Sequence, residues 1–377
     1  MRPLFLLLGL IGFVSAYDLV RDYSGPTFFD DWDFYGSWDN LTLGDVWWLN
    51  REDAFSQRLV STTPTGTSIL KIDNSAFVPF NTKRNSVRIT SKHAYGVGSL
   101  WVIDLLHIPY GCSVWPAFWT KGPVWPDNGE IDIMEGINGM QTNQYALHTL
   151  PGCVHSPSPQ KGTTREVDCS VPSGCTVMEA SGNSYGPGFA VAGGGVYATQ
   201  FDVTGIYIWF FPRSSIPSSL LQSSNSPSLS LSDWGPPSAS YPSKSCNIPQ
   251  FFSPQNLVLD ITLCGIWAGD PVNYLPTCGN SGGGSTSNQG GQPGQGGPTQ
   301  CYLDNVVGQG SPKYDNAYFE INHVRAYTTG GAVPSPTVPI SSGRQFKNGA
   351  VRVRVGLGLF GRGLILVLLF VVARVFS

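Results

Sequence analysis

Short runs of apolar residues, separated by turn-forming Gly, Pro, Asn and Ser, recur along most of the chain. The runs are of strand length and rich in Val, Ile, Tyr, Phe and Trp, and several alternate apolar with polar positions, which is typical of β-strands. No long stretch keeps the 3.6-residue period of an amphipathic helix. Many short strands in one domain predict an all-β fold of two packed sheets, a sandwich of the jelly-roll kind. The predicted strands are Ser68–Ile72, Ser86–Ser91, Ser99–Leu105, Glu130–Met134, Val196–Phe201, Ile206–Phe211, Leu257–Thr262 and Tyr318–Tyr327.

Two segments interrupt this strand pattern. Ser214–Ser245 is dominated by Ser and Pro and is predicted to be a long loop. Gly279–Gln300 is a Gly-rich, low-complexity stretch between Cys278 and Cys301, and a strand-like run follows it. We therefore expect a disordered surface loop that is inserted in one domain, residues 17–328, and is held by those two cysteines.

The composition supports a turn-rich β-protein. Of the 377 residues, 45 are Gly and 29 are Pro, 12% are aromatic and only 12% are charged. Few charges and many aromatics argue against a helical bundle, a coiled coil or an acidic disordered chain. The formal net charge of −3 offers no basic face for nucleic acid.

Both ends of the chain resemble targeting segments. Residues 1–16 join an Arg to an apolar run and a Val-Ser-Ala end, which predicts a secretory signal peptide. Residues 329–354 form a predicted stalk and spacer, and residues 355–377 a hydrophobic tail preceded by small residues at 341–343, the order of a GPI-attachment signal. The alternative is a retained membrane anchor, although the uninterrupted apolar core, Gly363 to Ala373, is short for a bilayer span.

Processing at both ends would leave an acidic domain. Loss of residues 1–16 and 342–377 removes seven cationic residues and no acid, which gives a net charge of −10. We expect a monomeric extracellular protein at the cell surface or cell wall, attached there or to the membrane through its tail.

Cysteine usage agrees with secretion. An even number of cysteines behind a signal peptide predicts disulfides, whose connectivity the sequence leaves open. None has the close spacing of a zinc finger, no calcium signature is clear, and no metal or cofactor is predicted. Asn40-Leu41-Thr42 is a glycosylation sequon. The eight cysteines are at positions 112, 153, 169, 175, 246, 264, 278 and 301.

The most informative motif is Trp125-Pro126-Asp127-Asn128-Gly129-Glu130-Ile131-Asp132-Ile133-Met134-Glu135-Gly136. On a strand, Glu130 and Asp132 share one face because successive side chains alternate. Strict alternation would put Glu135 in the core, where a charge is costly. One extra residue, a β-bulge near Ile133–Met134, would return Glu135 to the face of the other two acids.

Three carboxylates on one strand face have two interpretations. Their mutual repulsion raises some pKa values, which suits a general acid beside a nucleophile, the pair that retaining glycoside hydrolysis requires. A solvated edge strand or a calcium site would show the same three acids. The aromatic residues that precede the three acids favour sugar binding, because aromatic faces stack on sugar rings, although many of the 11 Trp residues must be core. The aromatic residues are Trp115, Phe118, Trp119 and Trp125.

The segment GCSVWPAFWTKGPVWPDNGEIDIMEGIN resembles the signature of glycoside hydrolase family 16, in its fungal endo-1,3(4)-β-glucanase branch of laminarinase type. The resemblance extends over most of residues 25–328. It includes Phe28-Phe29-Asp30-Asp31-Trp32, Val87-Arg88-Ile89-Thr90-Ser91, Leu147-His148-Thr149, Trp209-Phe210-Phe211-Pro212-Arg213-Ser214-Ser215-Ile216-Pro217, Leu263-Cys264-Gly265-Ile266-Trp267-Ala268-Gly269 and Ala317-Tyr318-Phe319-Glu320-Ile321-Asn322.

The resemblance implies a curved jelly-roll sandwich with an open substrate cleft on its concave face. Glu130 would be the nucleophile, Glu135 the general acid/base, and Asp132 would tune the pair by hydrogen bonding. His148 would lie on the neighbouring strand, near the bond that is cleaved. The other substrate-binding candidates are Trp119, Trp125, Arg88, Trp115 and Trp267.

Two departures from the family pattern concern distal subsites. Relatives often have Asn-Tyr at Trp47-Trp48 and Asp at Ile266. The resemblance implies a secreted, surface-attached retaining endo-β-glucanase acting on β-1,3 or mixed β-1,3/1,4-glucan. The alternatives are a cell-wall transglycosylase that uses the same residues and a non-catalytic glucan-binding protein.

Overall fold

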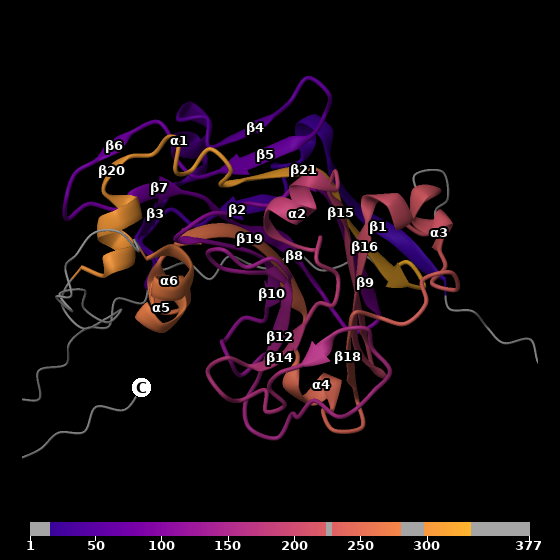
Figure 1. Cartoon of the computed structure of the whole chain (residues 1–377). Coiled ribbons are helices and arrows are strands. Elements are labelled where there is room, and N and C mark those ends of the chain that lie inside the picture. Colours follow the sequence, from indigo (N-terminus) through magenta and orange to yellow (C-terminus); the bar gives the residue numbers. More distant parts are fainter. Residues whose placement is uncertain (1–15, 224–227, 280–297, 333–377) are drawn as a thin grey trace, which may run out of the picture. The chain divides into compact units, whose positions relative to one another are not determined.

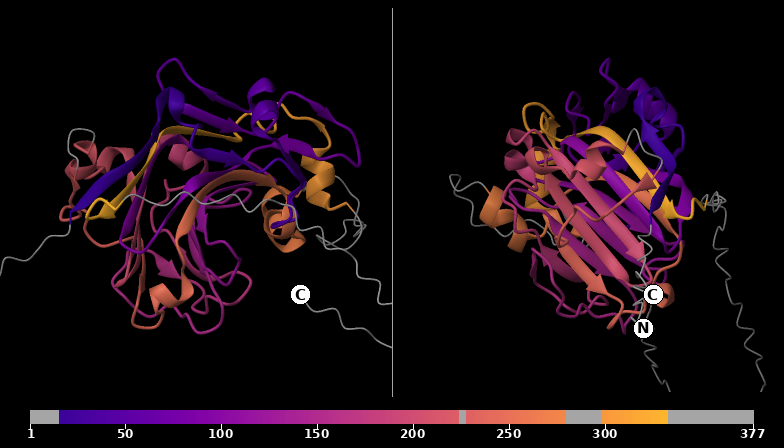
Figure 2. Two further views of the ribbon diagram at one scale, coloured as in Figure 1. Left: turned by 180° about the vertical axis from the view of Figure 1, so that it is seen from behind. Right: turned by 90° about the vertical axis from the view of Figure 1, so that its right-hand side faces the viewer.

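The computed structural model describes residues 16–223, 228–279 and 298–332, and these residues form two large antiparallel sheets packed face to face (Figure 1). The strands of the nine-stranded sheet lie side by side in Figure 2, with β4 and β5 extending it beside β21. In spatial order the main strands are β17 (Ser228–Leu229), β1 (Tyr17–Ser24), β21 (Tyr318–Thr329), β9 (Ser99–His107), β15 (Gly195–Asp202), β16 (Gly205–Pro212) and β18 (Ala239–Pro242), and the two additional strands are β4 (Val60–Thr62) and β5 (Ser68–Lys71).

The eight-stranded sheet carries the acidic motif on β11. Its strand β19 bends along its length, so the sheet is curved (Figure 1). The spatial order is β13 (Thr163–Thr164), β14 (Cys175–Met178), β12 (Gln144–His148), β11 (Glu130–Glu135), β10 (Val114–Lys121), β19 (Gln255–Leu263), β8 (Arg88–Tyr95) and β2 (Trp32–Phe34). The predicted all-β two-sheet sandwich is therefore confirmed.

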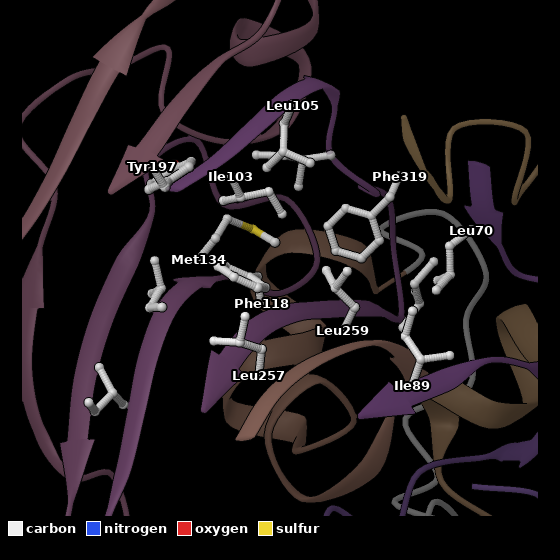
Figure 3. Packing of buried hydrophobic residues seen from close by; sticks show 14 of the residues in the cluster. Leu70, Ile89, Ile103, Leu105, Phe118, Met134, Tyr197, Leu257, Leu259 and Phe319 are labelled. Atoms are coloured by element: carbon white, nitrogen blue, oxygen red, sulfur yellow. The ribbon is translucent and has the colours of Figure 1, made fainter. Parts of the chain in front are cut away.

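Alternate residues from the two sheets fill the core between them (Figure 3). Ile103 on β9 and Phe319 on β21 meet Phe118 on β10 and Leu259 on β19, and all four are fully or almost fully buried. Met134 on β11 points into the same core. This packing holds the inner face of the eight-stranded sheet in place and leaves its other face for the site.

The remaining elements are short. The helices are α1 (Arg51–Ser56), α2 (Gly186–Val191), α3 (Ser218–Leu221), α4 (Ile248–Phe251), α5 (Gly265–Ala268), α6 (Pro271–Cys278), η1 (Gly25–Thr27), η2 (Arg213–Ser215) and η3 (Tyr302–Val306). The two-stranded sheets pair β3 (Val46–Trp48) with β7 (Arg84–Ser86) and β6 (Phe77–Val78) with β20 (Gly308–Gln309). Within residues 16–223, 228–279 and 298–332, no helix has the length and apolarity needed to cross a membrane.

The Ser/Pro-rich segment is more ordered than the sequence indicated. Ser214–Ser245 was predicted as a loop, but its described residues include α3, β17 and β18. Leu220 and Trp234 of this segment pack on the outer face of the nine-stranded sheet, against Trp209 and Phe211. Burial of these few apolar side chains orders a segment whose average composition is that of a loop.

All eight cysteines form disulfides, as expected. The pairs are Cys112–Cys278, Cys153–Cys246, Cys169–Cys175 and Cys264–Cys301. Cys278 and Cys301 do not pair with each other. Cys278 is joined instead to Cys112, just before β10 begins. Cys301 is joined to Cys264, directly after β19 ends. Each cysteine that flanks the Gly-rich segment is thus held by its own disulfide.

Several predictions concern residues outside the described ranges. These are the signal peptide up to Ser15, most of the Gly-rich loop, and the stalk and tail from Val333 onwards.

Candidate active site

A cavity of about 380 Å³ lies on the outer face of the eight-stranded sheet. Its floor is made by alternate residues of adjacent strands, as the two-residue period of a strand requires. One rim is formed by a loop that starts at Asp39, and the opposite rim includes Trp125. The floor residues are Arg88 of β8, Asp260 and Thr262 of β19, Trp115, Ala117 and Trp119 of β10, Glu130, Asp132 and Glu135 of β11, and His148 of β12.

Strand β11 contains the predicted bulge. On the β10 side, Phe118 pairs with Met134 and Trp119 pairs with Asp132, which leaves Ile133 as the extra residue. Glu130, Asp132 and Glu135 therefore all line the cavity, and Ile133 and Met134 are fully buried. The register thus confirms the predicted bulge.

Two glycines set the limits of β11. Gly129 has a φ of +75°, and a Cβ there would lie 2.2 Å from the Phe252 ring. A Cβ at Gly136 would lie 2.7 Å from the buried Tyr185 ring. Any larger residue at either position would push the strand away from its neighbours, so the acidic motif is flanked by glycine for reasons of space and backbone conformation.

His148 interacts with the first two acids of the motif. It pairs with Glu130 across β11 and β12, and its Nε2 lies 3.3 Å from Asp132 Oδ2. Burial disfavours the imidazolium, but Asp132 and the two glutamates outweigh this effect and raise the pKa of His148 to about 9. His148 is therefore cationic near neutral pH and offsets one carboxylate charge.

Glu135 is held by an indole. Trp115 donates its Nε1–H to Glu135 Oε1 at 2.8 Å. Burial and the charge of Asp132 raise the pKa of Glu135 to about 8, against the lowering effect of the Trp115 hydrogen bond. Trp267 was predicted to bind substrate, but it is absent from the cavity lining and packs edge to face on Trp115, with ring centroids 5.4 Å apart. Trp267 therefore supports Trp115 and does not line the cavity.

Asp260 is a further acid of the cavity that the sequence analysis missed. It accepts a hydrogen bond from Trp119 Nε1 at 3.0 Å, and burial raises its pKa to about 7, although Arg88 and Trp119 oppose this shift. Arg88 lies with its guanidinium carbon 5.0 Å from the Tyr35 ring centroid and 5.4 Å from that of Trp119. Only the sequence alternation within Leu257–Thr262 could have indicated that Asp260 faces away from the core.

The loop at the Asp39 rim was also missed. Asp39 is buried and organises the loop by accepting bonds from the backbone N–H groups of Leu41, Thr42 and Gly44. It also accepts from Thr262 Oγ1 at 2.8 Å, which ties the loop to β19. The lining also includes Asn40, Leu41 and Thr42 of the predicted sequon, Trp48 and Ile266 at the two departures from the family pattern, and Pro172.

The other aromatic candidates differ in exposure. Trp119 is buried in the floor, whereas Trp125 is 54% exposed at the edge of the cavity. An exposed indole face beside a cavity is available for stacking on a sugar ring, as the sequence analysis expected. The structure places every predicted site residue in the cavity lining except Trp267.

The cavity can hold carboxyl groups in different protonation states. Burial and the charge of Asp132 raise the pKa of Glu130 well above its usual value, with His148 opposing the shift. Joint ionisation of Glu130 and Glu135 is therefore disfavoured, and the two carboxyl groups titrate as interacting groups. A protonated carboxyl beside an ionised one is the pair needed for general acid and nucleophilic chemistry.

Three of these side chains also have the spacing of a cation site. One ligand atom each of Glu130, Asp132 and His148 lies within 4.8 Å of the others. Carboxylate and imidazole groups of this kind can bind a metal ion. The sequence predicts no metal at these residues, and the metal-free site stays a prediction.

Comparison with known proteins agrees with this geometry. The family model for XgeA-like catalytic domains of glycoside hydrolase family 16 matches residues 32–327. A probable endo-1,3(4)-β-glucanase of Aspergillus fumigatus is 38% identical over 327 residues, which are 85% of this chain and 47% of the relative. The chain thus spans about half the length of that relative.

Two solved structures share the fold. Laminarinase 16A from Phanerochaete chrysosporium, with 6-O-glucosyl-laminaritriose in donor and acceptor sites, is 30% identical with a TM-score of 0.71. An elongating β-1,3-glucosyltransferase of family 16 is 36% identical with a TM-score of 0.72. Each match covers 83% of this chain and 100% of the other.

Proposed function

The chain belongs to glycoside hydrolase family 16, and from this premise we propose that it is a retaining endo-β-glucanase acting on β-1,3 or mixed β-1,3/1,4-glucan. The observation that carries the proposal is the bulge in β11, because it places Glu130 and Glu135 on one face with Asp132 between them. Retaining hydrolysis requires two carboxyl groups on opposite sides of the scissile bond, at a separation of about 5 Å.

In the first step, Glu130 attacks the anomeric carbon as a carboxylate. A bond forms between its oxygen and that carbon, the glycosidic bond breaks, and Glu135 transfers its proton to the departing oxygen. The raised pKa of Glu135, about 8, keeps that proton available near neutral pH. The cationic His148 favours the ionised form of Glu130.

In the second step, the covalent glycosyl ester is hydrolysed. Glu135, now ionised, takes a proton from water as the water oxygen bonds to the anomeric carbon, and the bond to Glu130 breaks. The Trp115 hydrogen bond stabilises the ionised form of Glu135 in this step. Two displacements at one carbon retain its configuration.

The aromatic lining and the relatives support a glucan substrate. Trp125 at the rim and Trp119 in the floor offer apolar ring faces, and the polar groups beside them are hydrogen-bonding partners for sugar hydroxyls. The relatives are named as an endo-1,3(4)-β-glucanase and a laminarinase, and both names support a β-1,3-linked substrate.

The test is release of reducing sugar from laminarin and from a mixed-linkage glucan by the purified protein. Glu130→Gln and Glu135→Gln should each lower kcat by at least about a thousandfold on both polymers. Glu52→Gln, an exposed glutamate of α1, is the matched control and should keep parental activity. Proton NMR of the first product should show the β-anomer. Equal activity of the three variants, or an initial α-anomer, would reject the proposal.

A second candidate is transglycosylation by the same residues. It is favoured by the 36% identity to an elongating β-1,3-glucosyltransferase. If a sugar hydroxyl replaces water in the second step, the products become longer than the substrate. Incubating the protein with a laminari-oligosaccharide of one length separates the two activities, because hydrolysis gives only shorter products.

We also propose that the protein is secreted and attached to the cell surface or wall. The four disulfides support an oxidising compartment. Release of the protein from intact cells by a phosphatidylinositol-specific phospholipase would support GPI attachment, and release only by detergent would support a membrane span.

A further inference from the structure

The bulge in β11 is bridged by one buried side chain, that of Asn143. We propose that Asn143 is the positioning residue that holds the bulge and thereby places Glu135 for acid–base catalysis. The inference rests on the proposed function, since it concerns the same acid. Asn143 is absent from the cavity lining, so it would act on the reaction through Glu135 and not on the substrate.

The side-chain amide of Asn143 replaces a strand partner. Its Oδ1 accepts from Glu135 N–H at 2.8 Å, and its Nδ2 donates to the Ile133 carbonyl at 3.0 Å. An asparagine amide has one acceptor and a donor side by side, as a backbone peptide has. The two backbone partners require opposite polarities, so only one orientation of the amide satisfies both.

The bulged backbone needs this replacement. On the β12 side, Asp132 pairs with Ala146 and Glu135 pairs with Gln144, so two residues of β11 lie opposite the single residue Tyr145. A bulge disrupts the strand ladder locally, and backbone groups left unpaired in a buried place cost free energy. By pairing Ile133 C=O and Glu135 N–H, Asn143 favours the bulged register over regular alternation.

The register decides where the acid lies. With regular alternation, Glu135 would point to the side of Ile133, which is fully buried in the core. With the bulge, Glu135 lines the cavity and reaches Trp115 Nε1. The position of the acid/base therefore depends on the backbone that Asn143 holds.

Asn143 is itself held from outside β11. It is fully buried, its N–H donates to Ser184 Oγ at 3.0 Å, and its carbonyl accepts from Glu179 N at 2.9 Å. Ser184 is fixed in turn by donating to the Ser181 carbonyl at 2.7 Å. Asn143 therefore belongs to a rigid framework that joins the loop before β12 to the segment before α2.

The experiment compares two substrates that differ in their need for an acid. Laminari-oligosaccharides have poor leaving groups and need a proton from Glu135, whereas a dinitrophenyl β-laminaribioside leaves without one. Added azide then replaces water as a nucleophile that needs no base. Asn143→Ala should lower kcat on the oligosaccharide by about a hundredfold, with KM changed less than about threefold, and should lower the dinitrophenyl rate with azide by less than about fivefold.

A second variant and a control keep the test decisive. Asn143→Asp keeps the shape and the acceptor for Glu135 N–H but, when ionised, has no donor for Ile133 C=O, and it should show the same substrate selectivity in weaker form. Asn305→Ala is the matched control, because Asn305 is a buried asparagine on η3 whose Nδ2 donates to Cys301 O and Tyr274 Oη. It should lose stability but keep the parental ratio of the two rates.

Three outcomes separate the hypotheses. A parent protein inactive on both substrates would reject the proposed function, whatever the variants do. An active parent with equal losses on both substrates in the Asn143 variants would show a general structural role and overturn the inference. Parental activity in a folded Asn143→Ala protein would overturn it as well.

Discussion

Tryptophans on the outer faces of the two sheets have different roles, structural on the nine-stranded sheet and part of the cavity on the eight-stranded sheet. The nine-stranded sheet presents Trp209 of β16 on its outer face, and the eight-stranded sheet presents Trp115 and Trp119 of β10 on its outer face. On the nine-stranded sheet, the Ser/Pro-rich segment covers this face and makes a second apolar core. On the eight-stranded sheet, the same type of surface is left as the floor of a cavity.

The partners of the indole N–H groups show the difference most clearly. Trp209 donates to the Gly235 carbonyl and Trp234 donates to Ser219 Oγ, both within the covering segment. Trp115 and Trp119 donate to the carboxylates of Glu135 and Asp260. The indole N–H of Trp209 therefore helps to hold the Ser/Pro-rich segment on the nine-stranded sheet. The indole N–H groups of Trp115 and Trp119 instead orient acids of the cavity.

Removal of Trp209 from the covered face should cost more stability than any change at the cavity face. Trp209→Ala should destabilise the protein by about 3–5 kcal/mol, because it leaves a cavity between β16 and Trp234. The activity per folded molecule should stay at the parental level. Chemical denaturation measures the first quantity, and laminarin hydrolysis below the unfolding transition measures the second. A loss of activity in the folded variant would show that the two faces are not independent.

The second prediction concerns a change in the cavity face that should lower activity while the stability of the protein stays nearly the same. Trp115→Phe keeps an aromatic ring beside Trp267 but removes the donor to Glu135, and it should lower kcat by about tenfold to a hundredfold. The hydrogen bond lowers the pKa of Glu135, so its loss raises that pKa and moves the alkaline limb of the pH profile to higher pH. Trp209→Phe, which loses its bond to Gly235, is the control and should change neither quantity.

The third effect concerns the charge balance of the cavity. His148→Gln removes the cation that opposes the raised pKa of Glu130, so Glu130 should ionise only at higher pH. The acid limb of the pH profile of kcat/KM should move upward, and activity at pH 5 should fall about tenfold. An unchanged acid limb would mean that His148 does not set the ionisation of the nucleophile.

The raised pKa of His148 also predicts that the stability of the protein depends on pH. The folded pKa of His148, about 9, lies above the ordinary value of 6.5, so its stabilising contribution is complete below pH 6.5 and is lost as the pH rises through 9. The raised pKa of Glu135 acts in the same direction, between its ordinary value of 4.5 and about 8. The temperature of half-unfolding should therefore decrease as the pH is raised from 5 to 9. The decrease should be smaller in His148→Gln than in the parent protein.

The smallest effect is expected at the rim of the cavity. Trp125→Ala removes a ring that is 54% exposed, so stability should hardly change. KM for laminarin should rise about threefold to tenfold with kcat nearly constant, because stacking on a sugar binds the ground state and the transition state alike. A large fall in kcat would instead place Trp125 against the reacting sugar.

Much of the acidic face could be predicted from the sequence. The spacing of Glu130, Asp132 and Glu135, together with the cost of burying a charge, was sufficient to predict the bulge near Ile133–Met134. Asp260 and Asp39 could not be selected in this way, because their roles depend on Trp119 and on Thr262, which are distant from them in sequence. Trp267 was assigned to substrate binding because local sequence does not distinguish a lining residue from the residue that supports it.

Local sequence specifies the strand periods, the alternation of Glu130 with Ile131, and a motif whose charges exclude regular alternation. The packing of sheets and loops specifies which surfaces stay open and which side chains come into contact. The Ser/Pro-rich segment covers one sheet because Leu220 and Trp234 find a matching apolar face there. Asn143 hydrogen-bonds to the bulge because β12 pairs with β11. No local sequence pattern specifies contacts of this kind.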